Sequence, residues 1–444
     1  MQAPRAKSTV PSACGLSQPT ASTAVSWQNR RVPLVTVVIP TRNRPSLAAA
    51  AVRSVLDTGV DSVRVVVSDN STDLGHRDEL ERSCAALPRE RVRYLRPEAP
   101  LAMTAHWEWA LDHAIAATPG ATHVAYLTDR MLFRRGMLRA VLEAVARYPE
   151  QVVTYNHDRV DDTSRPVVLY RCASTGRLYE VRAEHLLELY SRVVLTSAVP
   201  RMLNSVVPTL VVEAVRQRFG TVFDSASPDF CFAFRCLEVV DQILFFDQAA
   251  LIHRALDRSN GQSVARGVPS EDGLDYVRGL GESNRNSAAP IPEFETLTNA
   301  IVHEYCLARD EARTERFPEI DRSCYLAAIA DDVKRMENPD LAARTLAQLK
   351  AHGWAPEAAA SRRTGPPLLR RVAERVRRSA PVSTASRWTW RALSRADIRP
   401  PASVAFRFRS TEAALEYEQS VGTRRAAAPS PRELLQGARI VDTA

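Results

Sequence analysis

The chain has 444 residues, 45% of them hydrophobic and 25% charged, and its formal net charge is +8 at pH 7. A chain of this length is expected to hold one catalytic-sized domain and one or two smaller units, and its apolar content excludes a wholly disordered protein. No apolar run reaches the roughly 18 residues of a membrane span, and the seven scattered cysteines, without a Cys-x-x-Cys pair, argue against a zinc or disulfide framework.

The first 31 residues are rich in Ser, Thr, Ala, Pro and Gln without periodicity, so we expect a disordered lead. They contain no apolar run typical of a signal peptide, which predicts a cytoplasmic protein. From Leu34 the pattern changes abruptly. The strand "LVTVVIP" precedes the helix "SLAAAAVRSVLDTG", with Ser46 as the expected N-cap and Gly59 just beyond the helix end.

Strand and helix then alternate about four times. The expected elements are a strand "VRVVVSD", a helix near 76–86, a strand "VRYLR", a helix over 104–117, a strand "HVAYLT", a helix over 135–147 and a strand "VVTYN". This alternation predicts an α/β fold with a mostly parallel central sheet, because right-handed crossovers are the favoured connection between parallel strands.

Ligands of such sheets bind outside the carboxyl ends of the strands, where this chain places polar residues. They are Thr41, Arg42 and Asn43 after the first strand, Asp69, Asn70, Ser71, Thr72 and Asp73 after the second, Arg96 after the third, and Asp129 with Arg130 after the fourth. Ordinary turn chemistry explains Asn and Ser at such ends. It does not explain arginines and aspartates that converge on one edge, so we predict a ligand site there.

Several of these segments, in order, resemble the inverting GT-A-fold glycosyltransferases of the large bacterial family 2 type. "VTVVIPTRNRPSLAAAAVRSVL" and "VRVVVSDNSTD" are similar to the family's opening, and "LAMTAHWEWALDHA" is similar to a stretch of some bacterial polysaccharide members. "YLTDR" stands where the family has an Asp-any-Asp or Asp-Asp signature. The resemblance covers roughly 33–265 and implies a GT-A (nucleotide-diphospho-sugar transferase) domain over residues 32–266.

The resemblance implies a nucleoside-diphosphate sugar as the donor. Asp69 matches the aspartate that accepts a hydrogen bond from a ring N–H of the nucleobase, a role that suits an ionised carboxylate. The donor-binding residues implied are Pro40, Thr41, Arg42, Asn43, Asp69, Asn70, Ser71, Asp129 and Arg130.

The resemblance also implies a divalent metal, Mg or Mn, held by Asp129 against the diphosphate. Arg130 stands where a second carboxylate is expected, and three interpretations are open. Asp129 holds the metal with help from the diphosphate, water and His253. Alternatively, Arg130 supplies the positive charge itself, because a guanidinium binds phosphate oxygens in a bidentate fork. In the third interpretation, Asp129 and Arg130 form only a surface ion pair.

A general base is implied by "SPDF", which resembles the family's second carboxylate motif at the head of a helix. On that match Asp229 deprotonates the acceptor hydroxyl, which attacks the anomeric carbon with inversion. Asp224 is the fallback base. The alternative is that Asp229 is an ordinary acidic residue in a first helical turn.

The sequence of residues 290–355 predicts a small helical bundle, with three helices that begin at "PEFETL", "PEIDRS" and "PDLAAR". Residues 361–398 form a basic amphipathic segment with Trp388 and Trp390, typical of attachment to an anionic membrane surface, or else a soluble helix docked on the bundle. No nucleic-acid partner is expected, because no recognition module accompanies the arginines. Residues 399–444 are expected to be a loosely ordered tail, apart from a candidate helix at "STEAALEYEQSVG".

Together these features predict a cytoplasmic glycosyltransferase, peripheral at the inner face of the membrane, that acts in polysaccharide biosynthesis. It would move a sugar to a hydroxyl of a glycan or lipid-linked acceptor with inversion. A non-catalytic GT-A-like protein that binds a glycan or serves as a scaffold is the alternative. A sugar nucleotidyltransferase is disfavoured, because "PTRNRPS" follows the first strand where a Gly-rich phosphate loop would stand.

Overall fold

The computed structural model describes residues 33–172, 174–268, 286–355, 403–420, 434 and 438–443. The expected disordered lead and the basic amphipathic segment 361–398 lie outside these residues. The first elements are β1 (Val35–Thr41), α1 (Pro45–Leu56), β2 (Val63–Asp69), α2 (Leu74–Ala85), β3 (Val92–Leu95), α3 (Met103–Ala117) and β4 (His123–Tyr126). They follow the predicted order of strands and helices.

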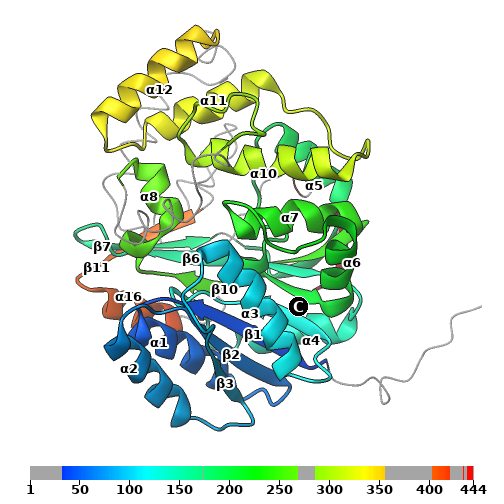
Figure 1. Ribbon diagram of the computed structural model, residues 1–444, viewed down its shortest axis with the longest axis vertical. Helices are drawn as coiled ribbons and strands as arrows, with labels where there is room; N and C mark the ends of the chain where they lie inside the picture. Colours follow the sequence, from blue (N-terminus) through cyan, green and yellow to red (C-terminus); the bar gives the residue numbers. More distant parts are fainter. Residues whose placement is uncertain are drawn as a thin grey trace, which may run out of the picture. The chain divides into compact units, whose positions relative to one another are not determined.

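Strands β4, β1, β2 and β3 lie side by side in that order and are all parallel. Figure 1 labels β1, β2 and β3 of this part of the sheet. Every residue of β1 is buried, as expected for a strand covered on both faces. Alternate side chains enter different cores: Val37 belongs to the core that holds Val52 of α1, and Val38 to the core that holds Trp107 of α3. The predicted α/β fold with helices on both faces is confirmed.

The start of α1 differs from the prediction. Pro45 is the first helical residue and Arg44 the N-cap position, so Ser46 lies within the first turn and caps nothing. Proline fits this place because its fixed φ suits a helix and its missing N–H would be unpaired there. Gly59 follows the helix with φ 62°, as its predicted role requires.

The sheet continues through a mixed half. Its elements are β5 (Met131–Phe133), α4 (Met137–Arg147), β6 (Val153–Asp161), β7 (Val167–Cys172), β8 (Arg177–Arg182), α5 (Ala183–Ser191), η2 (Met202–Asn204), β9 (Ser205–Pro208), α6 (Thr209–Phe219), α7 (Pro228–Val239) and β10 (Gln242–His253). Strand β9 runs antiparallel to both β4 and β6, and β10 runs parallel to β6. The carboxyl ends of β6 and β10 therefore lie at the same edge as those of β1, β2 and β4.

The remaining elements are η3 (Leu256–Arg258), α8 (Asn260–Arg266), α10 (Leu297–Ala312), α11 (Arg322–Val333), α12 (Pro339–Ala351), β11 (Ser403–Phe408), α16 (Thr411–Ser420) and β12 (Ala438–Thr443). The three helices predicted within 290–355 are present, but α10 and α11 begin at the N-caps Thr296 and Asp321 rather than at the preceding prolines. Helix α10 packs on α7, and both contribute to one hydrophobic core.

The expectation of a loosely ordered tail is wrong for the part of 399–444 that the structure describes. Strand β11 pairs with β7, β12 pairs with β8, and the candidate helix is present as α16. The Glu418 carboxylate of α16 is fully buried, 2.5 Å from Arg134 Nη2 and 3.1 Å from Arg171 Nε. Strand pairing, this ion cluster and a small hydrophobic cluster that includes Ala414 fix the described part of the segment.

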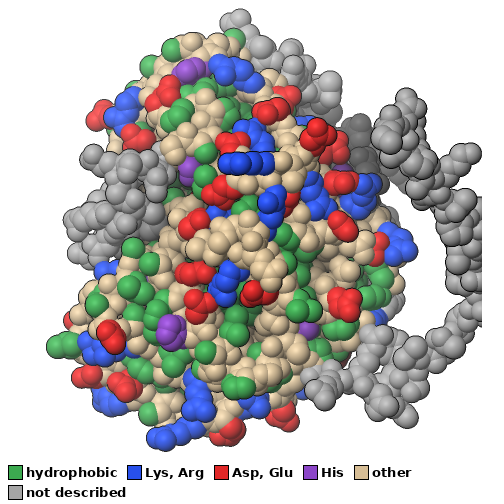
Figure 2. All heavy atoms as spheres, turned by 45° about the vertical axis from the view of Figure 1, so that its right-hand side comes forward, with side chains coloured by type: hydrophobic (Ala, Val, Ile, Leu, Met, Phe, Trp, Pro, Cys, Tyr) green, Lys and Arg blue, Asp and Glu red, His purple; other side chains and the backbone are tan. Residues whose placement is uncertain are grey.

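The charged residues on the face drawn in Figure 2 are mixed, with Lys and Arg side chains interspersed among Asp and Glu. Among the described residues, that face shows no broad patch of one charge sign. Within the described residues, no helix combines the length and the apolar character needed to cross a membrane.

Candidate functional site

The ends of β1 and β4 meet at Asp129. Its Oδ2 accepts a hydrogen bond from Thr41 Oγ1 at 2.9 Å, and its Oδ1 lies 3.3 Å from Arg44 Nη1. Asp129 is only 3% exposed, and its ion pair is with Arg44. The interpretation of Asp129 and Arg130 as a surface ion pair is therefore wrong.

Arg130 is half-buried beside this pair. Burial lowers the pKa of its guanidinium, and the nearby carboxylates of Asp129, Asp162 and Asp229 oppose that shift. The Arg130 side chain is therefore close both to Asp129 at the end of β4 and to the predicted base, Asp229. The main-chain carbonyl of Arg130 accepts a hydrogen bond from Arg254 N at 3.0 Å, so the ends of β4 and β10 are joined there.

A cavity of about 180 Å³ opens beside Asp69. Asp69 Oδ1 accepts from Ser71 N (2.9 Å) and Ser71 Oγ (2.5 Å), and Oδ2 accepts from Tyr94 Oη at 2.7 Å. These bonds fix the orientation of a buried carboxylate at the cavity wall. The lining residues are Asp69, Asn70, Ser71, Thr72, Arg77, Arg96, Pro97, Glu98 and Pro100.

Two predicted donor residues brace the loops of this cavity. Asn43 Oδ1 accepts from the main-chain nitrogens of Thr72 (2.9 Å) and Asp73 (3.1 Å), so it ties the loop after β1 to the loop after β2. Asn43 has φ 56°, a left-handed conformation that asparagine tolerates better than most residues. Asn70 exchanges two hydrogen bonds of 2.8 Å with the main chain of Leu101. Both amides therefore hold the site's shape.

Two other predicted donor residues sit at the end of β1. Pro40 is buried in the sheet beside Ser68 of β2. Arg42 is half-buried and close to His106 of α3, where burial, assisted by Arg42, lowers the histidine pKa to about 4. Arg42 thus adds positive charge at the strand end.

Asp229 begins the first turn of α7 and is half-buried. Burial raises the pKa of its carboxyl, while Arg201, two main-chain N–H groups and Arg130 oppose the shift. Arg201 lies in the segment before η2, and its guanidinium stands 5.4 Å from the ring centre of Phe230. Asp229 therefore lies near the guanidinium groups of Arg130 and Arg201. The fallback base, Asp224, instead bonds Arg235 Nη2 at 2.7 Å.

His253 stacks on His157, with 4.3 Å between the ring centres. Burial, the His157 ring and nearby arginines hold the pKa of His253 far below its usual range, so the ring is neutral at pH 7. A neutral imidazole can bind a metal, but no group of three or more His, Cys, Asp or Glu side chains gathers anywhere in the described chain. Arg44 and Arg130 place positive charge beside Asp129, and this disfavours a divalent cation held by that carboxylate alone.

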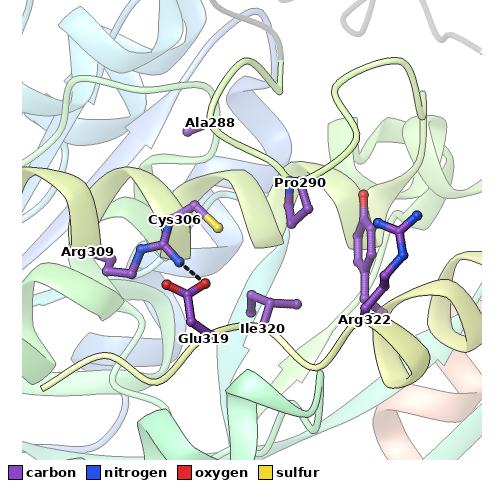
Figure 3. Close-up of a pocket in the computed structure, with 8 residues that line it drawn as sticks. Ala288, Pro290, Cys306, Arg309, Glu319, Ile320 and Arg322 are labelled. Atoms are coloured by element: carbon purple, nitrogen blue, oxygen red, sulfur yellow. Dashed lines mark hydrogen bonds and ion pairs between the residues drawn. The ribbon is translucent and has the colours of Figure 1, made fainter. Parts of the chain in front are cut away.

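A second cavity, of about 330 Å³, lies away from the strand ends, between α10 and α11 (Figure 3). Its Arg309 pairs with Glu319 at 2.8 Å, so its charge is already compensated. The cavity shares no residue with the group around Asp69, Asp129 and Arg130 at the strand ends. We assign the functional site to that group.

Several residues of the strand-end site were missed in the sequence: Arg44, Arg77, Tyr94, Arg201 and Arg254. Arg44, Tyr94 and Arg254 carried a signal, because each stands within two residues of a strand-end or site residue that the sequence predicts, in "TRNR", "YLR" and "IHR". The others reach the site from elements whose position depends on the tertiary fold.

Residues 36–195 match the family model described as Glycosyl transferase family 2. No curated protein sequence matches the chain. Similar solved structures include S. aureus TarS, 11% identical with a TM-score of 0.35, over 69% of this chain and 50% of that one. TarS 1–349 in complex with UDP-GlcNAc is 13% identical with a TM-score of 0.38, over 68% and 81%. The complex of TarS 1–349 with UDP is 13% identical with a TM-score of 0.37, over 68% of this chain and 80% of that one. The chain thus spans about half the length of full TarS.

Proposed function

We propose that the protein transfers a sugar from a nucleoside diphosphate to a hydroxyl acceptor with inversion, on the support of the match of residues 36–195 to the Glycosyl transferase family 2 model. One observation carries the proposal: the Asp69 cavity, the Asp129–Arg130 strand end and the Asp229 helix start all lie at a single sheet edge. Each has the chemistry that one part of the reaction needs.

The nucleobase occupies the cavity beside Asp69. Ser71 and Tyr94 take up some lone pairs of its carboxylate and hold it still, and the remaining ones can accept a ring N–H. Arg77 and Arg96 line the same cavity and suit base carbonyl or ribose oxygens.

The diphosphate lies against arginines rather than a carboxylate-held metal. Arg254 supports this assignment, because its buried Nε and Nη2 have no hydrogen-bond partner among the described residues. Buried donors without acceptors are costly, and phosphate oxygens would satisfy them. Arg130 and Arg254 would thus stabilise the negative charge that develops on the departing diphosphate.

Asp229 serves as the general base. Its raised pKa makes it a stronger base than an exposed aspartate, and Arg201 and Arg130 favour its ionised form. The acceptor hydroxyl gives its proton to Asp229 as its oxygen attacks the anomeric carbon, and the nucleoside diphosphate leaves from the opposite face. We further propose a glycan or lipid-linked acceptor, reached at the inner membrane surface. The arginines and tryptophans of residues 361–398 support that location.

Calorimetric titration with UDP, GDP, dTDP and CMP, each with manganese and with chelator, tests the proposal. We expect selective binding of one nucleoside diphosphate that survives the chelator. Binding that needs manganese would contradict the arginine mechanism. No binding of any of them would contradict the donor site, and selective binding without transfer would favour the non-catalytic alternative.

A further inference from the structure

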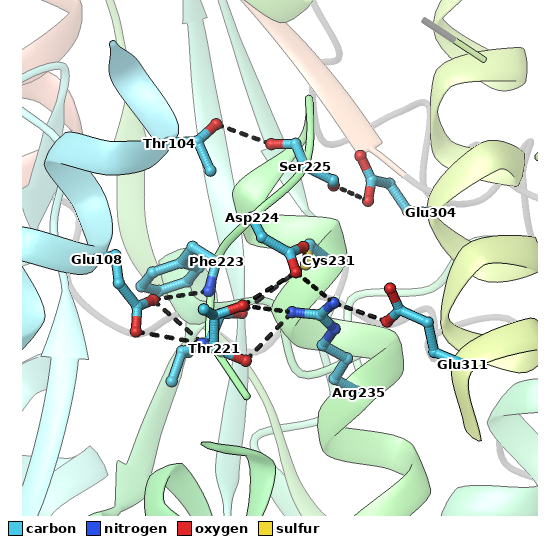
Figure 4. Close-up of polar contacts among 11 residues, drawn as sticks. Thr104, Glu108, Thr221, Phe223, Asp224, Ser225, Cys231, Arg235, Glu304 and Glu311 are labelled. Carbon is cyan, nitrogen blue, oxygen red and sulfur yellow. Dashed lines mark hydrogen bonds and ion pairs between the residues drawn. The ribbon is translucent and has the colours of Figure 1, made fainter. Parts of the chain in front are cut away.

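The loop that leads into the Asp229 helix, residues 221–227, is held by three helices (Figure 4). From α3, Glu108 Oε2 accepts the main-chain N–H groups of Val222 (3.1 Å) and Phe223 (2.8 Å). The Thr104 hydroxyl, also on α3, donates to the Ser225 carbonyl at 2.8 Å. One side of the loop is thereby fixed to the helix that packs against β1.

Arg235 of α7 holds the middle of the loop. Its guanidinium is 1% exposed and donates to Asp224 Oδ2 and to Glu311 Oε2 of α10, both at 2.7 Å. It also donates to the Thr221 carbonyl at 3.2 Å. Both carboxylates are partly exposed, so Arg235 bridges the loop to the helical region.

Glu304 of α10 holds the end of the loop, next to the base. It is 1% exposed, its Oε1 accepts Ser227 N at 2.7 Å, and its Oε2 accepts the Ser225 hydroxyl. Ser227 is the N-cap residue of α7, and its own side chain makes no capping hydrogen bond in the described structure. In a capping box, a glutamate of the same helix accepts this N–H. Here a glutamate from another helix does so.

We propose that Glu304 is a positioning residue for the transfer reaction: it fixes Ser227 and the first turn of α7, and so places the Asp229 carboxylate against the acceptor hydroxyl. The inference rests on the proposed function. It gives the helical region beyond the family-matched residues a part in catalysis, because α10 supplies an anchor two residues from the base.

Glu304 suits this role because it adds little charge beside the base. Burial, together with Asp229 and Asp224, raises its pKa to about 8, so it is mostly protonated at neutral pH. A charged neighbour would instead repel the Asp229 carboxylate. A glutamine should therefore replace Glu304 well, since its oxygen can accept Ser227 N–H and its amide can donate to Ser225 Oγ.

The test compares Glu304→Ala, Glu304→Gln and the control Asp310→Asn in the full chain. Asp310 is an exposed carboxylate on the same helix that pairs with Arg309 and lies outside the loop network. We expect Glu304→Ala to lower kcat roughly 10- to 100-fold with little change in nucleotide affinity, because a base misplaced by about 1 Å costs that much. Glu304→Gln and Asp310→Asn should stay near wild type. Amide exchange over 221–232 should accelerate only in Glu304→Ala.

Wild-type kcat in a folded Glu304→Ala protein would overturn the inference, as would equal losses of kcat and nucleotide affinity. If Glu304→Ala does not fold, Ser225→Ala takes its place and should lower kcat alone, while Glu304→Gln should still match wild type. If the wild type transfers sugar and Glu304→Ala does so at the same rate, only the positioning role of Glu304 is overturned. A wild type that transfers no sugar overturns the proposed function with it.

Discussion

The Thr41 hydroxyl at the end of β1 donates a hydrogen bond of 2.9 Å to the carboxylate of Asp129, 88 residues further along the chain. Because Asp129 is buried, this bond both stabilises its charge and sets the spacing of the two strand ends that flank the donor site.

Replacing Thr41 by valine keeps the shape of the side chain but removes the donor. We expect the free energy of unfolding to fall by about 1 to 3 kcal/mol, with weaker nucleotide binding, because a buried carboxylate loses a partner. Urea denaturation and calorimetry measure both effects. Thr314→Val is the control, since this exposed hydroxyl also meets a carboxylate, Glu238 Oε2 at 3.1 Å. Equal losses in the two variants would contradict a special role for Thr41.

Arg130→Ala should weaken nucleoside diphosphate binding roughly 10- to 100-fold, the usual worth of charged hydrogen bonds to phosphate. Binding of the nucleoside alone should change little, because the base contacts lie in the Asp69 cavity. Titration of both ligands gives the comparison, with the exposed Arg135→Ala as the control. An unchanged affinity for the diphosphate would remove Arg130 from the donor site.

Asp229→Asn should leave nucleotide binding intact and lower the transfer rate roughly 10²- to 10⁴-fold, because the amide cannot take up the acceptor proton. Asp224→Asn is the matched variant: it should destabilise the protein, since Arg235 loses a charged partner, while its folded fraction still transfers sugar. The reverse pattern, measured in the same steady-state assay, would move the base to Asp224.

The pH dependence of stability should reveal Glu418. Burial and the nearby Asp158 raise the pKa of Glu418 from 4.5 to about 7, against the opposing effect of Arg134 and Arg171. A carboxyl with a raised folded-state pKa stabilises the fold at low pH, and this contribution is lost as pH rises through about 7. Thermal melts of the wild type should therefore decline between pH 5 and pH 8 more than those of Glu418→Gln, which imitates the protonated form. Parallel declines would contradict this assignment.

Much of the fold could be predicted because its signals are local. The β-branched run of β1, the helical periodicity of α1 and the polar residues after each strand are all visible within short windows. Their convergence on one edge followed from the rule for parallel sheets. Thr41, Asp69, Asp129 and Arg130 therefore do lie at that edge, whereas Asp229, predicted from the family resemblance, reaches its neighbourhood from the start of α7.

The remaining parts of the site depend on contacts between distant segments. Glu304 carries no local mark of its role, since in the sequence it is one more acidic residue on an amphipathic helix. Arg201 precedes a short 3₁₀ helix whose place is set by β9. The tail was misjudged for the same reason, because β11 and β12 are stabilised by partner strands far away in the sequence.

The late pairing of β12 with β8 has a consequence for synthesis on the ribosome. Strand β8 emerges long before its partner, so in the growing chain one of its edges is open to solvent and to other nascent chains. Truncated forms that end before residue 403 would keep that edge open, along with the edge of β7 that β11 covers. Shortened versions that keep Arg254 but end before residue 403 are therefore expected to aggregate during expression even though every proposed donor contact is retained.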